Sequence, residues 1–179
     1  MFKILKSEII YCGKKFKVIK ENIILPNGRK AVREIVDFPG ASAILPIIGG
    51  DKVLLIKQFR TTVHDWILEV PAGTLKPGED PLSCAKRELR EETGYIAHRW
   101  TKLASILTSP GYSNEVLHIF LAENLEKKEK EPEKTEVIEN IVMPVDEALK
   151  KVFTGEIVDG KTVVALLMYG FERKQWRLL

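Results

Sequence analysis

Strand-forming stretches occupy most of residues 15–73, and a helical pattern replaces them only from Pro81 onward. The early stretches are rich in β-branched and apolar residues and are separated by turn sequences such as the one at residues 26–29. Between Pro81 and Thr93, apolar residues instead recur at helical spacing, and Gly94 is placed to end the helix. The residues that form this apolar stripe are Leu82, Ala85 and Leu89.

Strand patterns return after this helix, and helical patterns close the chain. The strands are expected at residues 102–108, 115–123 and 137–144, and the helices near Asp146–Phe153 and Thr162–Arg173. Residues 124–136 are charged and contain a proline, which predicts a surface loop. An order of strands, helix, strands and helices is typical of an α+β fold in which a mixed sheet is sandwiched between helices. With no linker in evidence, residues 1–179 are predicted to form a single domain.

Composition narrows the possible partners and compartments. The net charge of +3, from 28 basic and 25 acidic residues, comes without a basic stripe and argues against nucleic-acid binding. No run of about 18 apolar residues is present, which argues against a membrane partner. The first ten residues do not read as a secretory signal, and two cysteines, Cys12 and Cys84, are too few for a disulfide framework. A cytoplasmic location is therefore expected.

The stretch from Gly155 to Thr162, GEIVDGKT, matches the phosphate-binding P-loop letter for letter. A P-loop requires a strand before it and a helix after it, yet residues 145–154 look helical. Two of its variable positions, Glu156 and Asp159, would also repel a polyphosphate. We therefore interpret this stretch as a connection between two helices, with Gly155 ending the first and Asp159 capping the second.

A cluster of carboxylates is the strongest chemical signal. Glu88, Glu91 and Glu92 project from nearly one side of the 81–93 helix, and Glu79 comes from the loop before it. Such a cluster is either a solvated face or a site for a hard cation. Because it contains oxygen ligands and no histidine, it would suit Mg²⁺ or Mn²⁺ and not Zn²⁺.

The residues around this cluster resemble the Nudix box. The matching positions are Gly73, Glu79, Arg87-Glu88-Leu89, Glu91-Glu92 and Gly94, all at the spacing of that motif. Tyr95 departs from the usual aliphatic residue, at a packing position. The resemblance implies a Nudix hydrolase fold with Mg²⁺ (Mn²⁺ as an alternative) held by Glu88, Glu92 and the carbonyl of Ala72. It also implies that Arg87 pairs with Glu79.

A second resemblance concerns the substrate. Pro110 follows Gly94 by sixteen residues, which is similar to the ADP-ribose pyrophosphatase branch of the family. That branch implies Mg²⁺-dependent hydrolysis of ADP-ribose to AMP and ribose 5-phosphate. Broader action on nucleoside diphosphate sugars or dinucleotides, and a non-catalytic ADP-ribose sensor, remain alternatives. The implied substrate-binding residues are Arg33, Glu34, Arg60, Ser109, Gly111 and Glu115.

The charged loop and the N-terminal strands complete the expectations from the family. In related enzymes a loop glutamate binds metal and organises the attacking water, and Glu136 is the matching position, with Glu133 as the fallback. Glu92 is expected to share in catalysis as well as in metal binding. Residues 1–40 resemble antiparallel strands that often exchange across a homodimer, so a homodimer is expected.

Overall fold

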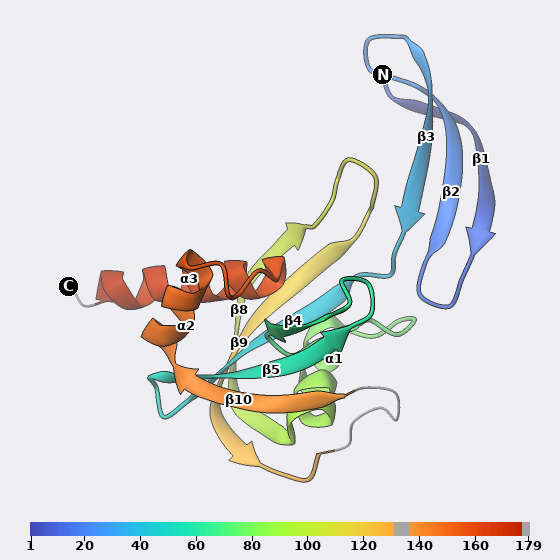
Figure 1. Cartoon of the computed structure of the whole chain (residues 1–179). Helices are drawn as coiled ribbons and strands as arrows, with labels where there is room; N and C mark the ends of the chain where they lie inside the picture. The colour runs from blue at the N-terminus through green and yellow to red at the C-terminus, as the bar shows by residue number, and fades with distance from the viewer. Residues whose placement is uncertain (131–136, 177–179) are drawn as a thin grey trace. The chain divides into compact units, whose positions relative to one another are not determined.

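The structure is a computed structural model that describes residues 1–130 and 137–176, with side chains described to residue 173, and it divides into two compact units (Figure 1). The first unit comprises Met1–Gly40 and Ile106–Leu117, and the second comprises Ala41–Ser105 and the described part of His118–Leu179. The expectation of a single domain over residues 1–179 stays a prediction. Within the described residues, no helix is both long and apolar enough to span a membrane.

The first unit is built on a three-stranded antiparallel sheet in the order β1-β2-β3. Its strands are β1 (Lys3–Cys12), β2 (Lys17–Ile24) and β3 (Lys30–Asp37). The turn between β2 and β3 uses Gly28 at a φ of 82°, a left-handed conformation that glycine adopts without strain. The turn at residues 108–115 also belongs to this unit, and Val36 donates a 2.7 Å backbone hydrogen bond to Tyr112.

The second unit holds a larger sheet flanked by helices. Its strands run in the order β10-β5-β4-β9-β8, with β6 paired to β5 and β7 paired to β4. The strands are β4 (Ala41–Ile48), β5 (Lys52–Arg60), β6 (Asp65–Glu69), β7 (Ala72–Thr74), β8 (Tyr95–Leu107), β9 (Val116–Lys127) and β10 (Ile138–Pro144). The helices are α1 (Pro81–Glu88), the π-helical turn η1 (Leu89–Thr93), α2 (Val145–Phe153) and α3 (Gly160–Trp176).

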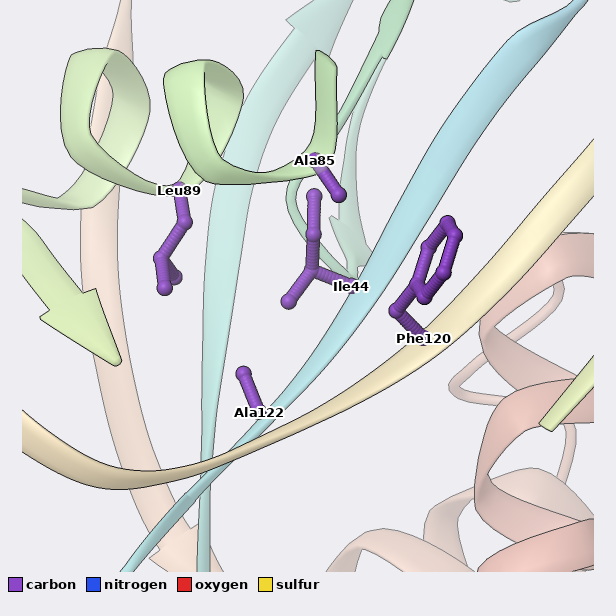
Figure 2. Packing of buried hydrophobic residues seen from close by; sticks show 5 residues of the cluster. All are labelled: Ile44, Ala85, Leu89, Phe120 and Ala122. Atoms are coloured by element: carbon purple, nitrogen blue, oxygen red, sulfur yellow. The ribbon is translucent and has the colours of Figure 1, made fainter. Parts of the chain in front are cut away.

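The central strands explain why helices cover the sheet. Residues 42–47 of β4 and residues 53–56 of β5 are unbroken runs of buried positions, so both faces of these strands are covered by other elements there. The stripe of α1 packs onto the sheet through Ala85 and Leu89, which lie against Ile44 and two residues of β9 (Figure 2). Full burial of a leucine or isoleucine contributes about 1.5–3 kcal/mol. The predicted α+β class, the mixed sheet between helices and the N-terminal antiparallel strands are confirmed.

The structure differs from the sequence-based prediction at two places, the end of the 81–93 helix and the start of the charged segment 124–136. The segment from Pro81 to Thr93 is not one α-helix, because its last five residues form the π-helical turn η1. The charged segment 124–136 does not begin as a loop, because β9 continues to Lys127 and carries a positive φ of 54° at Asn124. Strand pairing with β8 thus extends further than the charge pattern indicated.

Candidate active site

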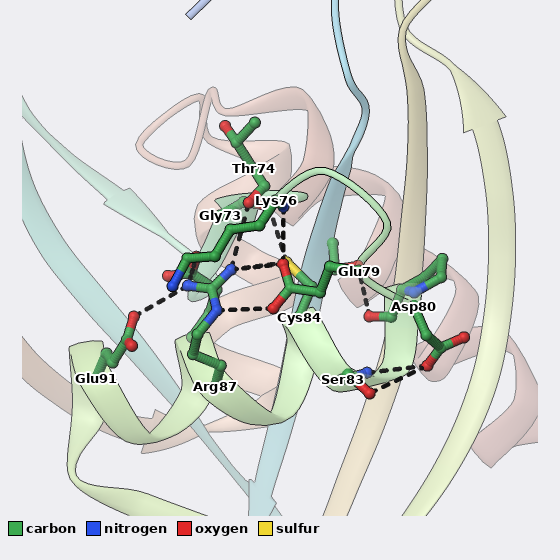
Figure 3. A network of polar contacts seen from close by, with 12 residues as sticks. Gly73, Thr74, Lys76, Glu79, Asp80, Ser83, Cys84, Arg87 and Glu91 are labelled. Atoms are coloured by element: carbon green, nitrogen blue, oxygen red, sulfur yellow. Dashed lines mark hydrogen bonds and ion pairs between the residues drawn. The ribbon is translucent and has the colours of Figure 1, made fainter.

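Arg87, on the last turn of α1, gathers three carboxylates around its guanidinium group (Figure 3). Its Nε lies 2.8 Å from Glu79 Oε1 and its Nη2 lies 3.0 Å from Glu79 Oε2, a two-bond pairing. Its Nη1 donates to Glu88 at 2.5 Å and to Glu91 at 3.0 Å. The predicted pair of Arg87 and Glu79 is confirmed.

This pairing lowers the pKa of Glu79, the carboxylate in the loop before α1. Hydrogen bonds from Arg87, with a further one from the backbone of Lys76, hold the pKa of Glu79 at about 2. The same carboxylate raises the pKa of Arg87 further above its already high ordinary value. Asp80 begins α1 by accepting a 3.1 Å hydrogen bond from the backbone N–H of Ser83. The loop is therefore fastened to the helix by charge as well as by its cap.

The predicted metal ligands meet at β7. A Cβ atom added to Gly73 would lie 1.8 Å from Glu88 Oε1, so the carboxylate of Glu88 lies directly over this glycine. Glu92 Oε2 accepts a 3.0 Å hydrogen bond from the backbone N–H of Ala72, and Glu92 is 3% exposed. The structure thus brings Ala72, Glu88 and Glu92 together, and only glycine at position 73 leaves room for the arrangement.

The π-helical turn changes where the last box residues point. Such a turn closes i→i+5 hydrogen bonds, so the side chains within and beyond it are displaced relative to a continuous α-helix. Thr93 stabilises it by donating its hydroxyl to Leu89 O, and Asn140 of β10 donates a 2.8 Å hydrogen bond to Thr93 O. Gly94 then ends it at a φ of 74°. Single π-helical turns inside α-helices occur often at functional sites.

The donor set fits a hard divalent cation. Carboxylates and a backbone carbonyl are the ligands that Mg²⁺ takes from proteins, and the space over Gly73 is already lined by Glu88. Over residues 1–130 and 137–173, no three acidic, histidine or cysteine side chains are gathered closely enough to hold an ion. In the described arrangement Glu88 is instead bonded to Arg87, and Glu92 to the backbone of Ala72.

Arg60, at the end of β5, belongs to a different ion pair in the same unit. Its Nε lies 2.6 Å from Glu69 Oε1, and its Nη2 lies 2.7 Å from Glu69 Oε2. The side chain of Glu69 is 1% exposed and that of Arg60 is 35% exposed. Sequence analysis missed Glu69, and the signal that could have indicated it was a carboxylate at the end of the apolar run Trp66–Leu68.

The P-loop-like stretch is a helix-to-helix connection, as predicted. The helix α2 precedes it and α3 follows it, Gly155 has a φ of 77°, and Asp159 caps α3 through the backbone N–H of Thr162 at 3.0 Å. Lys161 forms ion pairs with Glu69 and with Asp159, the latter at 2.9 Å. The lysine that matches the motif is therefore engaged by two carboxylates.

The remaining substrate-binding candidates lie in the first unit. Arg33 and Glu34 are exposed on β3, where Arg33 donates a 2.8 Å hydrogen bond to the carbonyl of Val32. The turn that carries the other three is tied to β3 by Ser113, which donates to Val36 O at 3.1 Å. Those three candidates are Ser109, Gly111 and Glu115. Glu115 accepts a 2.5 Å hydrogen bond from Thr108.

Glu133 and Glu136 lie outside the described residues, so their predicted roles are not tested. The residues on either side of them lie close to the end of the box. Lys128 donates a 2.7 Å backbone hydrogen bond to Gly94, and Lys130 Nζ donates to Ile138 O at 3.0 Å. Lys128, which precedes this segment in the chain, therefore lies next to Gly94, the residue that ends the box.

Comparison with known proteins identifies a protein family and several proteins to which this chain is similar. The family model described as NUDIX domain matches residues 38–164. An ADP-ribose pyrophosphatase of Bacillus subtilis (strain 168) is 41% identical over 166 residues, which cover 92% of this chain and 90% of that protein. A methanol dehydrogenase activator of Bacillus methanolicus is 40% identical with the same coverage of both chains. An ADP-ribose pyrophosphatase of Mycobacterium tuberculosis (strain ATCC 25618 / H37Rv) is 33% identical, covering 93% of this chain and 82% of that protein.

The fold itself also has a solved counterpart. A crystal structure described as ADP compounds hydrolase superposes with a TM-score of 0.85, covering 98% of this chain and 95% of that chain. Its sequence is 24% identical, so the likeness concerns the fold.

Proposed function

Because this chain belongs to the Nudix family, we propose that it hydrolyses the diphosphate of ADP-ribose to AMP and ribose 5-phosphate. The observation that carries the proposal is the convergence of Glu88 and Glu92 on the backbone of Ala72 and Gly73. The similarity to two ADP-ribose pyrophosphatases, over nine tenths of this chain, supports this choice of substrate.

Three groups would hold Mg²⁺, with Mn²⁺ as a substitute: the carboxylates of Glu88 and Glu92 and the carbonyl of Ala72. A bound Mg²⁺ neutralises charge on diphosphate oxygens and lowers the pKa of a bound water. Arg87 contributes by holding the loop of Glu79 and the carboxylate of Glu88 in one cluster. The carboxylate of Glu92 is held over β7 by the Ala72 N–H, which limits the rotamers available to it.

In the second unit, Arg60 is the residue that we assign to the diphosphate. Arg60 Nη1 faces away from the edge bound to Glu69 and is suited to a non-bridging phosphate oxygen. On the first unit we assign the adenine side and diphosphate to Arg33 and Glu34. The terminal ribose would be contacted by Ser109, Gly111 and Glu115.

Glu136 is proposed to orient the water that attacks phosphorus and to take its proton, with Glu133 as the alternative. General bases of this kind contribute roughly 10²–10⁴ in rate. Glu136→Gln should therefore lower kcat far more than it changes KM, and Glu133→Gln serves as the matched control. An unchanged kcat in the double variant would contradict this assignment.

The direct test is product analysis with ADP-ribose in the presence of Mg²⁺. The expected products are AMP and ribose 5-phosphate, and hydrolysis in ¹⁸O-water should place the label on a phosphate. Label on a ribose carbon would refute attack at phosphorus. Because the methanol dehydrogenase activator is nearly as similar as the first pyrophosphatase, the panel should also include nucleoside diphosphate sugars and dinucleotides.

The proposed assembly is a homodimer formed through the N-terminal strands, in the cytoplasm and without a nucleic-acid or membrane partner. The sheet β1-β2-β3 exposes large apolar side chains, including Ile4, Ile9 and Val32, which are 47%, 58% and 49% exposed. Apolar surface of this kind is typical of an interface. Analytical ultracentrifugation of wild type and of an Ile9→Lys variant should show a dimer and a monomer respectively. A monomeric wild type at micromolar concentration would contradict the assembly.

A further inference from the structure

Glu69 lies at the centre of a buried ionic network in the second unit. The Nε and Nη2 atoms of Arg60 occupy both of its carboxylate oxygens, at 2.6 and 2.7 Å. Lys161 Nζ binds the second of these oxygens as well. With 1% of its side chain exposed, Glu69 can exchange none of these partners for water without rearrangement.

The charges in this network are mutually dependent. Burial alone would raise the pKa of Glu69, but hydrogen bonds from Arg60 and Lys161 lower it below its ordinary value. The hydrogen bonds that Arg60 donates to Glu69 raise the pKa of Arg60. Glu69 and Arg60 are therefore both ionised at neutral pH. Arg60 is the member that reaches solvent, since it is 35% exposed whereas Lys161 is 15% exposed.

The position of Lys161 is itself determined by the first turn of α3. Asp159 Oδ2 accepts from the backbone N–H and the hydroxyl of Thr162, at 3.0 and 2.5 Å. The hydroxyl oxygen of Thr162 accepts a 2.8 Å hydrogen bond from the backbone N–H of Val70, the residue after Glu69. The start of α3 is thus bound to the end of β6 by Thr162, and the ion pair of Lys161 with Glu69 is a second, separate connection between the two elements.

We propose that Lys161 is a positioning residue for substrate binding, acting through Glu69 to hold the Arg60 guanidinium with its Nη1 edge toward the diphosphate. This role rests on the proposed function, in which Arg60 contacts the diphosphate. A carboxylate bound by Arg60 alone can rotate together with its partner, whereas a second cation from α3 fixes the plane of the carboxylate and hence that of the guanidinium. Pre-orientation of this kind lowers the entropy that substrate binding must overcome.

The kinetic test compares wild type with four variants, using ADP-ribose and saturating Mg²⁺. Lys161→Met should raise KM about tenfold with kcat within about threefold, an effect of the size seen between residues in direct contact. Lys161→Arg keeps a cation at this place and should recover most of the lost affinity. In an Arg60→Ala background, the further change Lys161→Met should leave KM unchanged, because the residue through which it acts is gone.

Thr162→Val is the matched control for a purely structural role. It removes the bonds to Val70 and Asp159 with little change in side-chain volume and leaves Lys161 and Glu69 in place. We expect it to lower the urea midpoint without raising KM. An equal rise of KM in Thr162→Val, or a tenfold rise from Lys161→Met in the Arg60→Ala background, would overturn the proposal. Should Lys161→Met fail to fold, Lys161→Gln replaces it with the same criteria.

A spectroscopic measurement separates this inference from the proposed function. The NMR signal of the Arg60 Nε–H is identified by its absence in Arg60→Lys. This proton should be protected from solvent exchange in wild type and in Lys161→Arg. In Lys161→Met it should exchange at least tenfold faster. If ADP-ribose is not hydrolysed but this dependence is found, the substrate is wrong and the positioning role stands. If the exchange rate does not depend on residue 161, the positioning role is refuted whatever the substrate.

Discussion

Replacing Arg87 by methionine should destabilise the protein strongly, because it leaves three carboxylates facing one another. The side chain of Arg87 is 20% exposed, and those of Glu79, Glu88 and Glu91 are 15%, 13% and 28% exposed. Removing one partner of a buried ion pair costs about 3–5 kcal/mol, whereas an exposed pair is worth about 0–1 kcal/mol. The cluster lies closer to the buried limit, so we expect a loss of about 3 kcal/mol in the free energy of unfolding.

Arg87→Lys distinguishes charge from geometry. An ammonium group retains the positive charge but cannot form the two parallel bonds to Glu79 while also reaching Glu88 and Glu91. A loss of about 1–2 kcal/mol is expected for this variant, since hydrogen bonds to charged groups are worth about that much. Combining Arg87→Met with Glu79→Gln should cost less than the sum of the single changes, because the second change removes a carboxylate left without its partner.

Urea unfolding at pH 7, followed by the fluorescence of Trp66 and Trp100, measures these differences. EDTA should be present throughout, because a divalent cation could replace the charge of Arg87. The control is Arg99→Met, which breaks a 3.1 Å pair with Glu123 in which the arginine side chain is 66% exposed. If Arg87→Met lowers stability no more than Arg99→Met does, the carboxylate cluster does not depend on Arg87 and the reasoning fails.

Three further predictions concern the same cluster. Glu88→Gln and Glu92→Gln should each remove most of the ADP-ribose hydrolysis while circular dichroism shows a folded protein, and wild-type rates at saturating Mg²⁺ would refute their assignment as ligands. Gly73→Ala should force the Glu88 carboxylate to turn away, because the new Cβ would lie 1.8 Å from its Oε1; we expect a raised Mg²⁺ requirement at nearly unchanged stability, and an unchanged requirement would contradict it. Glu79 has a pKa of about 2 against an ordinary 4.5, so its stabilising effect should be complete above pH 4.5 and disappear as the pH falls toward 2. The difference in unfolding free energy between wild type and Glu79→Gln should thus be constant from pH 8 to 5 and shrink below pH 5, and a difference that stays constant from pH 5 down to pH 2 would refute it.

The resemblance to the Nudix box implied the pair of Arg87 and Glu79, and the contact between these two residues is local. Glu79 and Arg87 are eight residues apart, and once a helix begins at Pro81 the arginine returns to the loop that carries the glutamate. The π-helical turn could not be predicted in the same way. Its departure from α-geometry begins only at Leu89, the last residue of the apolar stripe, so the spacing of the stripe is the same for a continuous helix.

The ion pair between Glu69 and Lys161 shows a different limit. These residues are 92 positions apart, and their contact depends on α3 packing where β6 ends. In a single sequence, Glu69 is one carboxylate at the end of an apolar strand, and neither periodicity nor spacing relates it to a helix near the C-terminus. Long-range pairs of this kind follow from the assembled fold, so the sequence indicated Arg60 as a substrate-binding residue but not its contacts with Glu69 and Lys161.

The P-loop-like stretch contains two residues, Lys161 and Thr162, whose role depends on the assembled fold. We concluded that this stretch is not a nucleotide-binding P-loop because a helix precedes it and because it contains two acidic residues. The structure has the helix α2 at this place. Lys161 and Thr162, which completed the match to the motif, nevertheless have a structural role. Thr162 is completely buried and the side chain of Lys161 is 15% exposed, because in the first turn of α3 Thr162 binds the backbone of Val70 and Lys161 binds Glu69. An aspartate cap followed by lysine and threonine places a carboxylate, a cation and a hydroxyl on one helical turn. In a P-loop the lysine and the threonine serve a bound phosphate, whereas here this combination fastens a helix to a strand and, by our inference, orients the arginine that meets the phosphate.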